Sequence, residues 1–343
     1  MALCEPRPAP KGISRKMNRR ALATLLCSLL LAAGCKTGDD AKAAATQLTA
    51  TAKCLTDYYT ALDTILAESD QLDAVQQVMY GIPYDDVTKA QIADTRAEIK
   101  KRAAVAKGLT DLAASFAKLT GSSATTDASA SAAKLATEVE SLKLTKSKMS
   151  SDEQTGMKAA VGLIVTAIQE HKEREAAHGM DQLTKSLHDF FVKEEPDYQS
   201  IGDQYAVLSG SLAISLLKNG QTDPAGFFKV ALDPYGLTPQ VTDPKLRDGI
   251  EKLAEQQVTA KEDALKTAQN KANEDMEKSL QQMSDRIHLV ADEKPMELRI
   301  APLSIANVEK WASEFQSAAG LSAPDTASSK SKDAAKDAPS STN

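Results

Sequence analysis

Apolar residues recur at spacings of three and four along most of this chain, and that spacing restricts the fold to packed helices. The first clear series is Leu48, Ala52, Leu55, Tyr59, Leu62, Leu66, Leu72 and Val75. On a helix with 3.6 residues per turn these positions fall on one face. The chain contains no alternating strand pattern of useful length and no repeat of fixed period. We therefore predict an all-α fold, an elongated bundle of about six helices.

Breaks in the spacing predict a long antiparallel hairpin near the start of the bundle. Gly81-Ile82-Pro83 ends a helix expected over about 41–80, because glycine allows a left-handed turn and proline cannot continue a helix. Asp85 or Asp86 can cap the second helix, whose apolar stripe continues to Leu119. Each helix would be roughly 50 Å long at 1.5 Å per residue.

The middle of the chain predicts shorter helices. Gly121–Ala132 consists of small residues and is expected to be a loop, followed by a helix to about Leu142. Ser150 with Glu153, or Ser151 with Gln154, fits a capping box for the next helix. Its apolar stripe changes phase after the polar run 169–175. We expect either a kink near His178-Gly179 or a middle section that leaves the bundle.

Proline marks the later boundaries. Glu195-Pro196-Asp197 is expected to restart a helix. Three Asp-Pro pairs follow, at 223/224, 233/234 and 243/244. Aspartate at the N-cap with proline at the first helical position is a strong start signal. The third pair predicts a long helix over about 244–290, and the first two predict turns or one-turn helices. A last helix, over about 303–317, would hold Trp311.

The N-terminal segment differs from the rest. Arg19 and Arg20 precede an apolar run from Ala21 to Ala33, shorter than the roughly 20 residues that span a bilayer, so we interpret it as a secretory signal. The residues Leu31-Ala32-Ala33-Gly34-Cys35 resemble the lipobox of bacterial lipoproteins. The alternatives are an ordinary signal peptide and a buried apolar helix.

The lipobox resemblance implies a set of modifications. The chain would be cut between Gly34 and Cys35, and the Cys35 thiol would carry a diacylglycerol group. The two acyl chains of the diacylglycerol, with a third on the new amino group, would anchor the protein stably, since one chain alone binds only marginally. Aspartate after the cysteine typically retains Gram-negative lipoproteins at the inner membrane. Lys36 stands there, so the resemblance implies the periplasmic face of the outer membrane, with a Gram-positive cell surface as the alternative.

These assignments divide the chain into four parts. Residues 1–34 form the signal peptide, of which 1–16 are interpreted as a misassigned start or a long n-region, since Met17 opens a normal one. A lipidated tether is expected at 35–45, the helical bundle domain at 46–317 and a disordered tail at 318–343. The tail is rich in Ser, Ala, Asp and Lys and has no apolar periodicity.

Charge and cysteine content limit the functions of the mature chain. Residues 1–34 hold six of the 41 basic and one of the 47 acidic residues, so the remainder has a net charge near −11. That balance argues against a nucleic-acid partner, which needs a concentrated basic surface. Beyond Cys35 only Cys54 remains, so the fold depends on its core alone unless Cys54 pairs between chains.

Candidate chemistry is sparse. Glu175 and His178 have the Glu-x-x-His spacing of helical di-iron sites, and His171 continues the same stripe. Such sites need the element twice, and a solvated polar stretch is the simpler interpretation of these weak metal candidates. No sequence motif of a hydrolase, nucleotide-binding site or zinc site appears. We expect no cofactor and no catalytic role.

Two segments, 157–168 and 205–217, are apolar nearly all round. They are expected to be central helices of the bundle. The sequence therefore predicts a lipid-anchored envelope lipoprotein that acts as a non-catalytic structural or adaptor bundle with a protein partner. One alternative is a binding module that holds an apolar ligand between these two segments. Another is a helical, membrane-inserting, toxin-like protein.

Overall fold

Helix signals in the sequence are realised almost throughout the molecule. The computed structural model describes residues 19–83, 85–117, 124–142, 150–170, 172–237, 239–292 and 308–313. Every regular element in these ranges is a helix, which confirms the all-α prediction. The expected C-terminal tail, 318–343, lies outside the described residues, as does most of the predicted last helix; residues 308–313 of it are helical.

The first two helices form the predicted hairpin. Helix α1 runs from Arg19 to Met79 and α2 from Asp86 to Ala117. Gly81 has a φ of 66°, the left-handed conformation that the turn requires. Asp85 caps α2 by accepting hydrogen bonds from the backbone N–H groups of Val87 and Thr88, at 3.1 and 3.3 Å.

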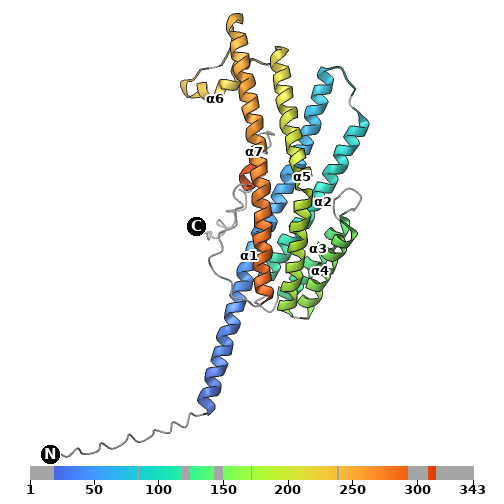
Figure 1. The fold of residues 1–343 in the computed structure, drawn as a ribbon, viewed down its shortest axis with the longest axis vertical. Coiled ribbons are helices and arrows are strands. Elements are labelled where there is room, and N and C mark those ends of the chain that lie inside the picture. The colour runs from blue at the N-terminus through green and yellow to red at the C-terminus, as the bar shows by residue number, and fades with distance from the viewer. Residues whose placement is uncertain are drawn as a thin grey trace, which may run out of the picture.

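Helix α1 begins upstream of its expected start at about 41. The segment 35–45, expected to be a tether, is part of this helix. Alanine, the strongest helix former, recurs at 41 and 43–45. Ala44 and Ala45 are also buried. Figure 1 shows the N-terminal part of α1 extending beyond the rest of the bundle, while its other end reaches the opposite extremity of the molecule.

Two shorter helices follow. Helix α3 spans Ala124–Ser141, so the loop expected over 121–132 is wrong for most of its length. Its small residues Ala128 and Ala132 are fully buried, and burial of that face stabilises helix there. Helix α4 spans Ser151–Gln169 and begins with the predicted capping box between Ser150 and Glu153.

The next helix corrects two predictions. Helix α5 runs without a break from Glu173 to Lys218, with Pro196 inside it. The change of phase in the apolar stripe marks the boundary between α4, which ends at Gln169, and α5, which begins at Glu173. Within α5 there is neither a kink near His178-Gly179 nor a section that leaves the bundle. Gly179 lies instead where α4 and α5 cross. A Cβ there would lie 2.7 Å from Cγ1 of Ile164.

The Asp-Pro pairs act as predicted. The first two lie at two short 3-10 helices, η2 (Pro224–Phe228) and η3 (Asp233–Tyr235), which flank the four-residue helix α6 (Lys229–Leu232). The third starts helix α7, Pro244–Ala291, and Asp243 accepts a hydrogen bond from the Lys245 backbone N–H at 2.9 Å.

The helices enclose one continuous core. Helices α1 to α5 each contact the next, α5 packs against α7, and α1 closes the arrangement against both α5 and α7. The largest fully buried side chains include Trp311, Tyr58, Tyr198 and Phe191, whose rings cluster at the centre. Among the described residues this is an elongated helical bundle (Figure 1).

Candidate functional site

An open groove lies between α1, α5 and α7, near the end of the bundle that is remote from the N-terminus of α1. Its volume is about 720 Å³. Helix α1 contributes Glu68 and Leu72, and Phe227 of η2 closes one end. The remaining walls come from α5 and α7: Tyr205, Ser209, Gly210, Ala213, Gln257, Val258, Ala260, Lys261, Glu262 and Leu265.

The groove exists because α5 is much longer than α4. Lys193 of α5 forms an ion pair with Glu153, in the first turn of α4. The two helices are antiparallel, so the part of α5 after this pair extends past the start of α4. Over that length α5 has α1 and α7 beside it, and segment 219–243, which contains η2, α6 and η3, connects it to α7.

Small residues on α5 bring α7 unusually close below the groove. A Cβ on Gly202 would lie 1.4 Å from Oε1 of Gln269, so a larger residue there would displace the Gln269 side chain. The Gln269 amide donates a hydrogen bond to the backbone carbonyl of Tyr198 at 2.6 Å. A Cβ on Gly210 would likewise lie 1.4 Å from Oε1 of Glu262, so the Glu262 side chain passes directly over α5 at this position. The absence of a side chain at Gly210 therefore lets the Glu262 carboxylate, which lines the groove, lie directly against α5.

The groove combines apolar walls with carboxylates. Leu72, Val258 and Leu265 supply apolar surface. Glu68 and Glu262 are half-buried, and neither forms an ion pair or hydrogen bond with another described residue. Burial raises the pKa of the Tyr205 hydroxyl, and the negative charge of Glu68 raises it further. The groove is therefore amphipathic, with two half-buried carboxylates at its edges.

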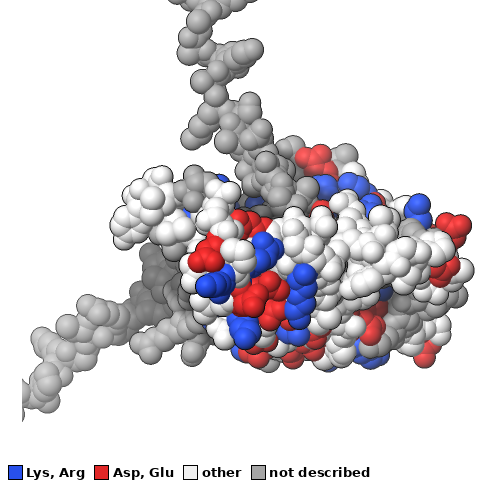
Figure 2. All heavy atoms as spheres, turned by 90° about the horizontal axis from the view of Figure 1, so that it is seen from above, with Lys and Arg blue, Asp and Glu red and all other residues white. Residues whose placement is uncertain are grey.

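Beside the groove, the end of the α1–α2 hairpin exposes apolar side chains. We call this surface the hairpin tip: Val75, Val78, Tyr80, Ile82 and Val87. Val78 is 77% exposed. Seen from above in Figure 2, uncharged residues make up most of the right-hand part of the surface, the side on which Figure 1 shows the α1–α2 hairpin, and side chains of both charges gather in the middle of the view. Tyr80 and Ser215 hydroxyls lie 3.2 Å apart, which links the hairpin tip to α5.

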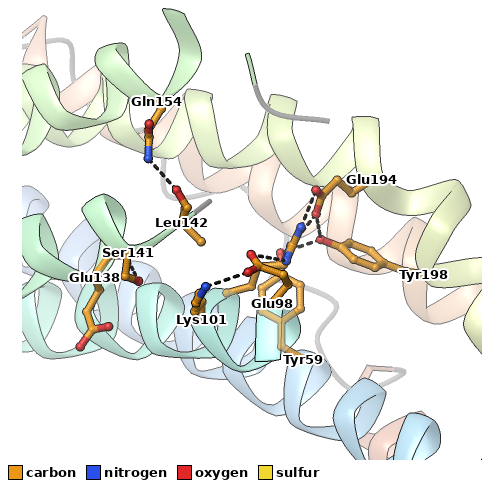
Figure 3. A network of polar contacts seen from close by, with 10 residues as sticks. Tyr59, Glu98, Lys101, Glu138, Ser141, Leu142, Gln154, Glu194 and Tyr198 are labelled. Atoms are coloured by element: carbon orange, nitrogen blue, oxygen red, sulfur yellow. Dashed lines mark hydrogen bonds and ion pairs between the residues drawn. The ribbon is translucent and has the colours of Figure 1, made fainter. Parts of the chain in front are cut away.

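A buried polar network holds α2 against α5 in the middle of the bundle (Figure 3). Arg102 donates hydrogen bonds to Glu194, and Tyr198 donates to the same carboxylate. Burial alone would lower the pKa of Arg102, but its hydrogen bonds to Glu194 raise it well above its usual value. The guanidinium therefore stays charged, and the network serves to hold helices together.

A second polar cluster links α1, α5 and α7. The Tyr58 hydroxyl donates to Oδ1 of Asn273 at 2.6 Å, and the Asn273 amide donates to Glu195 and Gln199. All of these bonds are internal to the helix packing. We assign this cluster, like the Arg102 network, to helix registration.

The residues expected at the lipidation site lie on α1. Gly34, Cys35 and Lys36 belong to its backbone, between Arg19 and the bundle, and their side chains lie outside the described set. Cleavage and lipidation there stay predictions. Among the described residues, no helix is both long and apolar enough to cross a bilayer.

The weak metal candidates are not brought into a cluster. His171 lies outside the described residues. Glu175 is exposed and forms an ion pair with Lys172 at 3.4 Å, and His178 is half-buried. Over the described part of the chain no three His, Cys, Asp or Glu side chains group in a way that could hold a metal ion.

The thiol of Cys54 is inaccessible in the folded chain. Cys54 is a free thiol with 1% of its surface exposed, on the core face of α1. Burial raises its pKa to about 12, with Glu309 and Asp57 adding to the rise. A disulfide between chains would require the bundle to open, so Cys54 acts as a core residue.

The two segments expected to enclose a ligand, 157–168 and 205–217, do not lie side by side in the described part of the chain. Segment 157–168 packs beside the early part of α5, near Gly179, whereas 205–217 lies beyond the start of α4. Of the two segments, only 205–217 lines the groove. No local pattern in the sequence indicates the groove itself, since its walls come from three helices far apart in the chain.

Comparison with known proteins adds no relative. The chain matches no family model, no curated protein and no solved structure.

Proposed function

We propose that this protein is a lipid-anchored envelope lipoprotein that acts as a non-catalytic adaptor, held at a membrane by Cys35 and bound to a partner protein at the opposite end. The observation that carries the proposal is the course of α1. One uninterrupted helix of 61 residues contains both the lipobox-like segment and the first half of the hairpin tip.

The geometry of α1 supports this division of roles. From Cys35 to Met79 a helix rises about 65 Å at 1.5 Å per residue. A lipid on Cys35 would therefore present the hairpin tip and the groove far from the membrane surface. Exposed apolar patches of this kind are typical of protein interaction sites.

Lys36 supports a location at the periplasmic face of the outer membrane. The support is the lipobox resemblance, in which aspartate at this position retains a lipoprotein at the inner membrane. Because the organism type decides whether this sorting applies, a Gram-positive cell surface is the alternative location.

The anchor is tested by metabolic labelling with a radioactive fatty acid. We expect label on the wild-type protein and none on Cys35→Ala, which should accumulate as an unprocessed precursor. Persistent label on Cys35→Ala would contradict lipidation at this residue.

The adaptor role is tested by affinity capture of the tagged, membrane-anchored protein. Val78→Asp with Val87→Asp adds two charges to the hairpin tip, at side chains exposed enough to leave folding intact. We expect this variant to lose a partner that the wild type captures. The control, Val192→Asp with Thr137→Asp, adds the same charge at exposed positions elsewhere and should keep that partner. Equal capture by all three proteins would contradict the proposal.

A second candidate is a binding module for an apolar ligand. The observation that favours it is the groove volume, about 720 Å³, which falls within the range of small-molecule pockets. Binding of a fluorescent fatty acid to the wild-type protein, and its loss in the variant Ala213→Trp, whose new side chain would fill the groove, would support this function.

A further inference from the structure

The groove contains charges that its own residues leave unbalanced. Glu68 on α1 and Glu262 on α7 are half-buried and form no ion pair with a described residue. Lys261 is the one basic residue among those that line the groove, and its side chain is exposed. We propose that the groove binds a cationic, amphipathic α-helix of the partner protein, with Glu68 and Glu262 as the partners of its basic side chains.

This inference rests on the proposed adaptor function and specifies the chemistry of the partner. Partly desolvated carboxylates favour a nearby positive charge. The apolar side chains Leu72, Val258 and Leu265, with Phe227 at one end, would meet the apolar stripe of such a helix. Basic residues on both edges of that stripe would face the carboxylates on α1 and α7.

The walls of the groove favour a helix over an extended peptide. Three helices line it, and the described residues provide no sheet edge to which a strand could add. A helix that inserts apolar side chains at positions i, i+3, i+4 and i+7 is the usual occupant of a groove between helices.

A short helix of the same chain already packs against α1, nearer the N-terminus of α1 than the groove. The short helix 308–313 buries Val308, Trp311 and Ala312, and the indole of Trp311 stacks on Tyr58 with ring centroids 4.9 Å apart. Tyr58 and Leu72 differ by about 40° around α1, given 100° per residue. The face of α1 that receives helix 308–313 thus continues, almost four turns on, into the groove.

The chain's own C-terminal residues are a weaker candidate for the occupant. Between 314 and 343 the only large apolar side chains are Phe315 and Leu321, and three basic residues are mixed with four acidic ones. Such a sequence lacks an apolar stripe. An acidic partner helix would be repelled by both carboxylates.

The test uses the full mature protein and designed 18-residue helical peptides. One peptide has a leucine stripe flanked by lysines, a second has glutamates in place of the lysines, and a third has the lysine peptide's composition in scrambled order. Fluorescence anisotropy at low and physiological salt measures the dissociation constants. Circular dichroism verifies that each protein variant is folded.

The decisive variant is Glu68→Gln with Glu262→Gln. Its control is Asp263→Asn with Glu277→Gln, which removes the same charge at exposed positions of α7 outside the groove. We expect the lysine peptide alone to bind, the groove variant to bind about 3- to 10-fold more weakly, and the control to match the wild type.

Three results of the peptide-binding measurements would overturn the inference. They are equal binding of the glutamate or scrambled peptide, equal weakening by the control variant, and binding that Glu68→Gln with Glu262→Gln leaves unchanged. A dimer of the mature protein that Ala213→Trp disrupts would also overturn it, because the groove would then hold a second copy. The affinity capture described above separates this inference from the adaptor function. If the wild-type protein still captures a partner through the hairpin tip, the peptide results contradict only the inference about the groove. If the wild-type protein captures no partner, the adaptor function itself is contradicted.

Discussion

Arg102 on α2 donates hydrogen bonds to both carboxylate oxygens of Glu194 on α5, at 2.6 and 2.7 Å, in the interior of the bundle. Both side chains are at least 95% buried. Tyr198 donates to the same carboxylate, and the Tyr59 hydroxyl lies 3.5 Å from that of Tyr198. The pair therefore joins the N-terminal hairpin to the α4–α5 hairpin at a single position.

Removing one member of this pair should strongly destabilise the protein. Arg102→Met leaves the Glu194 carboxylate buried without its cation, and we expect a loss of about 3–5 kcal/mol in the free energy of unfolding, measured with urea. Arg96 forms a similar bond to Asp63, at 2.8 Å, but is partly exposed. Arg96→Met should cost under about 1 kcal/mol. Equal losses for both variants would show that burial does not govern the Arg102 contribution.

Any larger residue in place of Gly179, at the crossing of α4 and α5, should lower the stability of the fold. A Cβ there meets Cγ1 of Ile164 and lies 3.1 Å from the backbone oxygen of Ala160, which cannot turn aside as a side chain can. We expect Gly179→Ala to cost about 1–3 kcal/mol. The control, Gly162→Ala on α4, has no atom within 4 Å of the new Cβ and should stabilise by about 0.5–1 kcal/mol. Thermal unfolding of both variants checks the contrast, and a neutral Gly179→Ala would contradict the observed packing.

Most helix ends could be predicted from the sequence, whereas contacts between distant helices could not. Local signals identified most helix ends: the capping box at Ser150, the turn at Gly81 and the start of α7 at Asp243 are each encoded within a few residues. The change of stripe phase near 170–175 was a correct signal of a discontinuity. Its position was misassigned because residues 170–172 include neither glycine nor proline.

Pro196 shows tertiary packing overriding a local signal. Proline inside a helix removes a hydrogen bond and costs about 3 kcal/mol, so a break was the reasonable prediction. Phe191 and Tyr198, on either side, are buried in the aromatic cluster, and the Gln269 side chain binds the Tyr198 carbonyl. Contacts with a helix about 70 residues further along the chain cannot be read from local spacing. The groove escaped prediction for the same reason.

High pH should destabilise the bundle through its buried tyrosines. Burial raises the pKa of Tyr58, Tyr59 and Tyr198 above the ordinary value near 10. Above about pH 10 the unfolded chain releases protons that the folded chain retains, so stability is complete below that pH and falls as pH rises. Cys54, with a pKa of about 12, extends the effect in the same direction.

An absorbance titration at 295 nm measures this effect. Of the seven tyrosines, we expect three to stay protonated in the native protein until helical circular dichroism is lost. In the urea-unfolded chain all seven should ionise together near pH 10. Ionisation of every tyrosine near pH 10 with the helices intact would contradict the burial of the three rings.

Lys36 should control sorting if the lipoprotein proposal is right. In a Gram-negative host we expect Lys36→Asp to move the protein from the outer-membrane to the inner-membrane fraction of a sucrose gradient. Lys42→Asp makes the same change in charge six residues further on and should leave the distribution unaltered. Co-fractionation of Lys36→Asp with the outer membrane would contradict the assigned role of this residue.

The central claim is that α1 carries a lipid anchor at one end and a partner surface at the other. Photocrosslinking in cells tests it most directly, with a photoreactive amino acid at Val78 on the hairpin tip or, as a control, at the exposed Lys278 of α7. We predict a discrete crosslinked protein from Val78, none from Lys278, and loss of the Val78 product when Cys35 is replaced by alanine. The absence of a Val78 product, or the same product from both positions, would contradict the claim.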